Sequence, residues 1–201
     1  MKKKMMAMLF AVVMACGVAG CGGNAEETPA EDQAVETTTE LDAETEEVAA
    51  GMQKELQNYG ADLTADSAAA TGMFTIQNGT VVGGQENWDA FAAGETDSVI
   101  ICQFSLKGGA MLDYVKHLEN GSYQVVSDIT RDGYEYEEKV DYTQKVYECL
   151  TVFEGFTLEE GSAEHTVCVL SNEAELDEDT FRTYWNELSM DAHQVYLLFV
   201  I

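Results

Sequence analysis

The apolar and polar residues that follow Gly72 alternate in a way that predicts a series of short strands. Ser98 to Leu106 is a nearly continuous apolar run, which is typical of a central strand buried on both faces. Asn120-Gly121 separates two of the runs and is a dipeptide that strongly favours a hairpin turn. We expect strands at 73–77, 98–106, 111–118, 122–129, 144–153, 165–170 and 194–201.

Helical spacing interrupts this alternation at two places. Trp88 and Phe91 fall on one face of a predicted helix over 85–93, and Asp177 can cap a second helix over 178–188. Sequential hairpins with two inserted helices indicate an α+β fold. We expect a mainly antiparallel twisted sheet of about six to seven strands, with the two helices packed on one face.

The first residues have the pattern of an export signal. Three lysines at positions 2–4 precede an apolar stretch over 5–18 that is too short to span a membrane comfortably. The stretch ends in Val18-Ala19-Gly20-Cys21, which resembles the lipobox of bacterial lipoproteins at every position. This resemblance implies a signal peptide over 1–20, a lipid on Cys21, and an anchor in the outer face of the cytoplasmic membrane.

The segment after Cys21 is poor in large apolar side chains. Residues 22–51 contain ten acidic residues and no basic one, a composition that cannot bury a core. We therefore expect the lipidated cysteine and a disordered acidic tether over 21–71, followed by a single α+β domain over 72–201. Within this tether, residues 41, 48, 52, 56 and 59 fall at helical spacing, which would suit a short helix over about 52–59.

The charge of the chain restricts its partners. The formal net charge is −27, and removal of the three lysines with the signal peptide takes it to −30. Nucleic acids are excluded as partners, because binding to a phosphate backbone depends on clustered Lys and Arg residues. Cationic partners, including divalent metal ions, are favoured instead.

Three cysteines fall within the expected domain. Cys102 alternates with apolar residues on a strand, which is typical of a small buried side chain. Cys149 and Cys168 lie on two strands joined by a polar loop, where antiparallel pairing could bring them together. We predict a disulfide between these two cysteines, which would close a loop of about 20 residues and stabilise the fold by about 3 kcal/mol.

Several short motifs occur in an order and spacing that resemble one protein family. They are Asn78-Gly79-Thr80-Val81-Val82, Trp88-Asp89-Ala90-Phe91, Ser98 to Leu106, Asp113 to Gly121, Thr130-Arg131-Asp132, and Cys149 with Cys168, 19 positions later. Together they cover about half the chain and resemble a family of small Gram-positive extracytoplasmic lipoproteins known only as a domain of unknown function. The resemblance implies a lipoprotein topology and a bridged cysteine pair, and it supplies no activity.

The segment 130–136 is the best candidate for recognition of a ligand or partner. It combines Arg131 and Asp132 with Tyr134 and Tyr136 in a glycine-containing stretch. Arg and Tyr are residues that commonly anchor interfaces. The alternative is structural: Arg131 pairs locally with Asp132 or Asp128, and the tyrosines pack on a strand.

The same region is also a candidate for a metal site. Asp128 and Asp132 match the first and fifth positions of a calcium loop. The template fails because Thr130 holds the third position and Lys139 holds the twelfth, where a bidentate Glu is required. A looser cation site could use Asp128, Asp132 and Glu135. A solvated run of charges is the alternative.

No enzyme template fits the chain. There is no nucleophile elbow, zinc-protease motif or glycine-rich phosphate loop, and His117, His165 and His193 have no ligand or triad spacing. We therefore expect a non-enzymatic binding or adaptor module of the cell envelope that needs no cofactor and binds an envelope protein or peptide. The alternatives are a divalent-cation-binding lipoprotein and an enzyme of unrecognised type.

Overall fold

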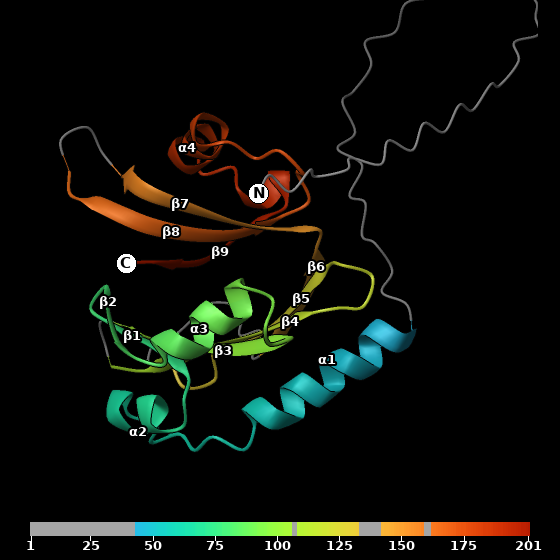
Figure 1. The fold of residues 1–201 in the computed structure, drawn as a ribbon. Helices are drawn as coiled ribbons and strands as arrows, with labels where there is room; N and C mark the ends of the chain where they lie inside the picture. Colours follow the sequence, from blue (N-terminus) through green and yellow to red (C-terminus); the bar gives the residue numbers. More distant parts are fainter. Residues whose placement is uncertain (1–42, 106–107, 133–141, 159–161) are drawn as a thin grey trace, which may run out of the picture. The chain divides into compact units, whose positions relative to one another are not determined.

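The computed structural model describes residues 43–105, 108–132, 142–158 and 162–201, all within one compact unit, Glu40–Ile201 (Figure 1). The predicted α+β class is confirmed. The elements of the described residues are, in chain order, α1 (Ala43–Leu56), α2 (Ala65–Ala70), β1 (Phe74–Gln77), β2 (Thr80–Gly83), α3 (Gln85–Ala92), β3 (Ser98–Phe104), β4 (Ala110–His117), β5 (Tyr123–Asp128), β6 (Tyr142–Tyr147), β7 (Cys149–Thr157), β8 (Glu164–Ser171), α4 (Glu178–Glu187), the 3-10 helix η1 (Asp191–His193) and β9 (Val195–Val200).

The strands form two sheets rather than one. The first has six strands in the order β2-β1-β3-β4-β5-β6, antiparallel except for the β1–β3 pair, and the second has the antiparallel order β7-β8-β9. The strand expected over 144–153 is divided between the sheets, since β6 ends at Tyr147 and β7 begins at Cys149. Glu148 lies at this crossing, where its backbone N–H donates to Oδ1 of Asn172 at 3.0 Å.

The helices cover different faces of these sheets (Figure 1). α1 and α2 pack on the outer face of the six-stranded sheet, while α4 packs on the outer face of the three-stranded sheet. The side chain of Asp177 caps α4 as predicted, by accepting a hydrogen bond from the Thr180 N–H at 2.7 Å. The two helices predicted from the sequence, α3 and α4, therefore do not share a sheet face.

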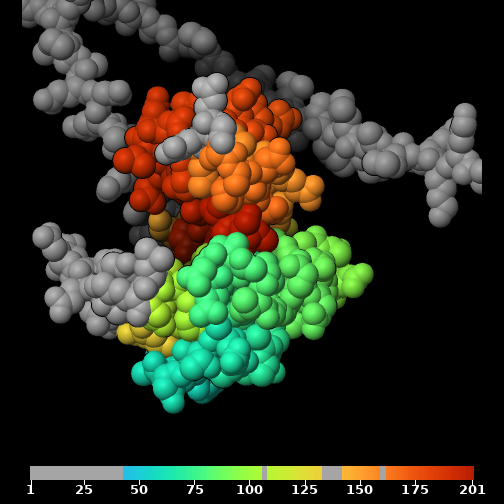
Figure 2. Space-filling model, turned by 90° about the vertical axis from the view of Figure 1, so that its left-hand side faces the viewer, coloured from blue at the N-terminus to red at the C-terminus, as the bar shows by residue number. Residues whose placement is uncertain are grey.

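The largest core cluster lies between the two sheets. Phe74 of β1 stacks on Trp88 of α3, with ring centroids 5.4 Å apart, and both rings contact Phe199 of β9. Burial of each such side chain contributes about 1.5–3 kcal/mol. Figure 2 shows the result from one side: the orange and red residues of the second sheet and α4 rest directly on the green residues of the first half.

The expected disorder of the segment up to Thr71 is wrong for its second half. Ala49, Met52 and Leu56 of α1 are buried against β4 and β5, with Leu56 completely inaccessible to solvent. Their spacing of three and four residues places them on one face of the helix, so a short apolar stripe was sufficient for docking. The folded region thus begins by Ala43, not near Gly72. Residues 21–42 lie outside the described part of the chain. Among the residues that the structure describes, no helix is long and apolar enough to cross a membrane.

Candidate functional site

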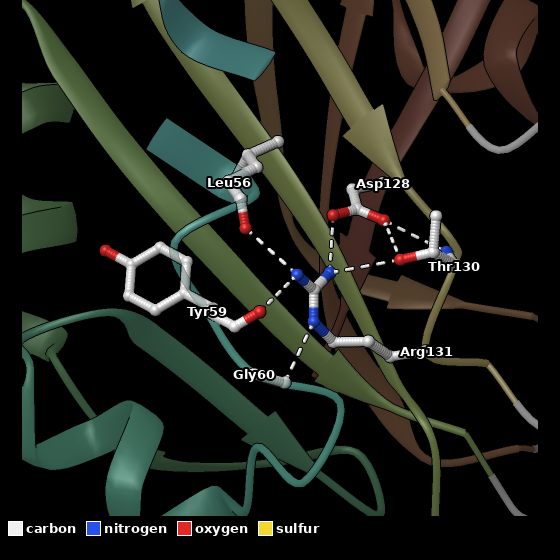
Figure 3. Close-up of polar contacts among 6 residues, drawn as sticks. All are labelled: Leu56, Tyr59, Gly60, Asp128, Thr130 and Arg131. Carbon is white, nitrogen blue, oxygen red and sulfur yellow. Dashed lines mark hydrogen bonds and ion pairs between the residues drawn. The ribbon is translucent and has the colours of Figure 1, made fainter. Parts of the chain in front are cut away.

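Arg131 lies buried beneath the end of α1 and binds the backbone there (Figure 3). Its guanidinium donates to the carbonyl oxygens of Leu56 at 2.9 Å, Tyr59 at 2.6 Å and Gly60 at 3.1 Å. The last carbonyl groups of a helix have no partner within the helix, and a cation at this end also interacts favourably with the helix dipole. Arg131 therefore fastens the C-terminal end of α1 to the first sheet.

Asp128 holds this guanidinium in place. Its carboxylate is completely buried and forms an ion pair with Arg131, whose side chain is only 6% exposed. The Asp128 carboxylate also accepts hydrogen bonds from the backbone N–H and the hydroxyl of Thr130, at 2.9 and 2.7 Å. The local pairing considered in the sequence is thus formed with Asp128, and Arg131 is turned inward rather than toward a partner.

The other residues of the predicted recognition and cation sites are only partly described. Asp132 is buried, with 7% of its surface exposed, in a turn where its N–H donates to the carbonyl of Ile129 at 3.1 Å. Tyr134, Glu135 and Tyr136 lie outside the described residues, as does Cys21. Within the described ranges, no group of three or more His, Cys, Asp or Glu residues could hold a metal ion.

The predicted disulfide is absent from the structure. Cys149 and Cys168 are both free, although β7 and β8 pair as expected. The register places Ser171 opposite Cys149 and Val152 opposite Cys168, so the two cysteines are offset along the ladder. Because neighbouring residues of a strand point to opposite faces, the offset of three positions also directs them to opposite sides of the sheet. Cys102 is buried, as predicted, and burial raises the pKa of its thiol to about 12.

A buried polar network crosses the space between the two sheets. Asp113 of β4 accepts hydrogen bonds from the hydroxyls of Ser127 at 2.6 Å and Tyr196 of β9 at 2.7 Å. Burial raises the pKa of Asp113, and the hydrogen bonds from Ser127, Tyr196 and Gln103 partly offset this rise. The network is enclosed between the sheets, so it joins them rather than offering a surface to a ligand.

An open pocket of about 220 Å³ lies next to the end of α1. It is bounded by the end of α1 and the turn that follows, by the segment between α2 and β1, and by α3, β3 and β4. Its lining residues are Glu55, Tyr59, Thr71, Gly72, Met73, Asn87, Thr96, Ser98, Val99, Ile100 and Tyr114. Elements that lie far apart in the sequence, from α1 to β4, thus meet at this site.

Four of the polar side chains that line it are Glu55, Tyr59, Ser98 and Tyr114. The Tyr114 phenol lies beside Glu55 and Ser98, and the Ser98 hydroxyl donates to the Asp97 carboxylate at 3.2 Å. Burial is the main reason that the pKa of Tyr114 is raised, and the negative charge of Glu55 raises it further. The pKa of Tyr59 is raised by the same two causes. Both phenols therefore remain protonated and neutral beside a carboxylate that is ready to accept hydrogen bonds.

Arg131 positions one wall of this pocket from behind. In Figure 3, the Tyr59 carbonyl faces the guanidinium, whereas the Tyr59 ring lies on the opposite side. The same arginine holds Leu56, the residue next to Glu55. The sequence analysis predicted that Arg131 belongs to a recognition segment. In the structure Arg131 instead positions Leu56 and Tyr59, which were predicted to belong to the tether.

Comparisons with known proteins add no relative. No protein family matches the chain, and no match was found among curated proteins or solved structures. The resemblance to small Gram-positive lipoproteins therefore stays a prediction from the sequence.

Proposed function

We propose that this chain is a membrane-anchored, non-enzymatic binding module of the cell envelope, and that the pocket beside α1 is its ligand site. The lipobox at Cys21 supports the anchor. The observation that carries the binding role is the pocket itself, where Glu55, Tyr59 and Tyr114 meet at an open cavity. Small ligands usually bind in concave sites where several polar groups converge, and the lining of this cavity is more polar than apolar.

The size of the pocket limits what it can bind. Its volume of about 220 Å³ exceeds the roughly 150 Å³ of a cavity that encloses benzene, and it is smaller than the pockets of about 300 Å³ or more that hold drug-sized ligands. It therefore suits a small molecule or a single side chain of a peptide. The second occupant agrees with a module that binds an envelope peptide or protein.

The walls of the site are held in place before any ligand arrives. Arg131 fixes the end of α1, and Asn87 of α3 donates to the carbonyl of Gly72, another lining residue, at 2.6 Å. Ser98 belongs to β3, in the middle of the six-stranded sheet. A preformed site loses less conformational freedom on binding, which favours affinity.

Binding can be tested by nuclear magnetic resonance with the full-length protein in detergent. A panel of small cationic, neutral and anionic compounds would be titrated, and the backbone amide shifts of residues that line the pocket compared with those of α4. We expect at least one compound to shift the amides of Gly72, Ser98 and Tyr114 in a saturable way, with α4 unaffected.

A blocking variant and its control complete this test. Thr96→Trp places a large ring at the mouth of the pocket and is expected to abolish the response, whereas Thr183→Trp makes the same exchange at an exposed position of α4 and is expected to preserve it. If no compound of any charge class shifts the pocket amides, the proposed function is wrong.

A further inference from the structure

We infer that the pocket selects a primary ammonium group carried on a short aliphatic stem. The inference rests on the proposed function, because it names the ligand class of the same site. The ammonium would bind the Glu55 carboxylate between the rings of Tyr59 and Tyr114, and the stem would lie along the apolar wall. The chemistry is the same whether the amine is a free molecule or a lysine-type side chain of a peptide.

The charges around the pocket favour a cation. Glu55 lines the pocket and forms no ion pair with any residue that the structure describes. A carboxylate has about four acceptor sites, so Glu55 can accept hydrogen bonds from a ligand even with the Tyr114 phenol beside it. The site therefore presents a negative charge that a cationic ligand would neutralise.

Two cations on elements that adjoin the site are already paired. Arg131 is bound to the buried Asp128 carboxylate, and Lys116 of β4 lies 4.0 Å from Asp97. Neither one neutralises Glu55 in this structure. The net charge of −27 on the whole chain adds a general attraction for cations and a general repulsion of anions.

The two tyrosines add selectivity for an organic ammonium. Tyr59 follows the end of α1 and Tyr114 lies on β4, so their rings reach the cavity from different elements. The faces of aromatic rings attract cations, and this attraction increases where water is partly excluded. A primary ammonium can also donate three hydrogen bonds, which the Glu55 carboxylate and the hydroxyl of Ser98 can accept.

The remaining lining suits an aliphatic stem. Met73, which is 3% exposed, belongs to the apolar cluster beneath α1 and presents apolar surface where it borders the cavity. Ile100 continues this wall. A stem of about five carbon atoms, somewhat smaller than benzene in bulk, fits within about 220 Å³ together with its ammonium group.

The test is isothermal titration calorimetry of the full-length protein in detergent with two pairs of matched probes. The first pair is pentylamine and 1-pentanol, which share a stem and differ in charge. The second pair is the Nα-acetyl methylamides of lysine and norleucine, which present the same contrast on a peptide backbone. We expect each amine to bind at least tenfold more tightly than its neutral counterpart. The tighter of the two amines identifies a free or a peptide-borne ligand.

Two charge-matched variants on α1 locate the effect. Glu55→Gln removes the pocket carboxylate and is expected to weaken amine binding at least tenfold, with little effect on 1-pentanol. Glu46→Gln makes the same change at an exposed position outside the pocket, and we expect it to change affinity by less than twofold. Melting curves of both variants would establish that they remain folded.

The outcomes separate the inference from the proposed function. If the neutral probes bind as tightly as the amines, or if Glu55→Gln binds amines normally, the ammonium selectivity is overturned while the pocket remains a binding site. If the amide shifts of the pocket respond only to anionic or uncharged compounds, the result is the same. If no compound binds, both proposals fail together.

Discussion

The guanidinium of Arg131 has five acceptors, three of which are backbone carbonyls more than 70 positions earlier in the chain. Its ion pair with Asp128 is shielded from solvent on both sides. Loss of one member of such a pair leaves the other charge buried without compensation, which is far more destabilising than loss of a surface pair. The stability of the fold should therefore depend strongly on this one side chain.

We predict that Arg131→Ala lowers the free energy of unfolding by about 3–5 kcal/mol, because Asp128 and the end of α1 lose their partner. Arg131→Lys should have an intermediate effect, since it keeps the charge but lacks the planar fork. Urea denaturation at neutral pH would measure both. Arg182→Ala is the matched control, because Arg182 is 30% exposed and pairs with Glu178 at 2.7 Å, and it should cost about 1–2 kcal/mol. A loss below 1 kcal/mol for Arg131→Ala would contradict the role of Arg131 in fastening the end of α1 to the first sheet.

Only part of this residue-level arrangement could be predicted from the sequence. The pairing of Arg131 with Asp128 was one of two local alternatives, because three positions along the chain is within reach of a long side chain. The carbonyl acceptors at the end of α1 could not be foreseen, since backbone groups carry no sequence signal. Glu55 and Tyr59 gave no indication that they would line a pocket with Tyr114, because they lie more than 50 positions before it in the sequence.

At the scale of elements, prediction succeeded where the pattern was local. β3, β4, β5, α3 and α4 begin and end within a few residues of the predicted positions, because alternation, helical spacing and caps are local features. α1 was anticipated only in part: helical spacing suited a short helix over about 52–59, but the helix spans Ala43–Leu56. Its glutamate- and alanine-rich composition indicated a tether, although Met52 and Leu56 dock on the sheet. Average composition says little about a stripe of three buried residues.

Two glycines in helical contexts should respond in opposite ways to the same substitution. Gly84 precedes α3 with φ of +71°, and a Cβ atom there would lie 2.1 Å from the carbonyl oxygen of Met73. Gly51 lies within α1, and a Cβ atom there would meet nothing within 4 Å. We predict that Gly84→Ala lowers the free energy of unfolding by about 2–4 kcal/mol. Gly51→Ala should raise it by about 0.5–1 kcal/mol.

Urea denaturation of both variants would give the two free energies, with hydrogen exchange of the α1 amides as a second measurement. The gain from Gly51→Ala requires that residue 51 is helical in the folded protein, so it also tests whether α1 is part of the domain. If Gly51→Ala had no effect on stability and the amides of 49–56 exchanged as fast as in a peptide, the segment would be a tether after all.

At the scale of the whole molecule, the sequence predicted the class of fold but not its division into two sheets. A single apolar run over 144–153 contains the end of β6 and the start of β7, and nothing in its pattern marks Glu148 as the crossing point. The contact that fixes this crossing comes from Asn172, 24 positions later. Long-range partners of this kind decide sheet topology, and a single sequence does not reveal them.

The network that joins the sheets should make stability depend on pH. Asp113 is buried and its pKa is raised above the ordinary value near 3.9, so the folded state binds its proton more tightly than the unfolded state does. Its contribution to stability is therefore largest at low pH and is lost as the pH rises through the raised pKa. Asp177 behaves in the opposite way, because the Thr180 N–H lowers its pKa and the resulting stability is lost as the pH falls.

We predict that Asp113→Asn, which keeps an oxygen acceptor for Ser127 and Tyr196 but cannot ionise, gains stability relative to the native protein as the pH rises from 4 to 8. Urea denaturation at several pH values would give this difference. Asp177→Asn serves as the internal control of opposite sign: its deficit relative to the native protein should be present at neutral pH and should shrink toward pH 3. A difference between Asp113→Asn and the native protein that stays constant over this range would mean that Asp113 ionises in the folded state as it does in the unfolded chain, and that the space between the two sheets is accessible to water.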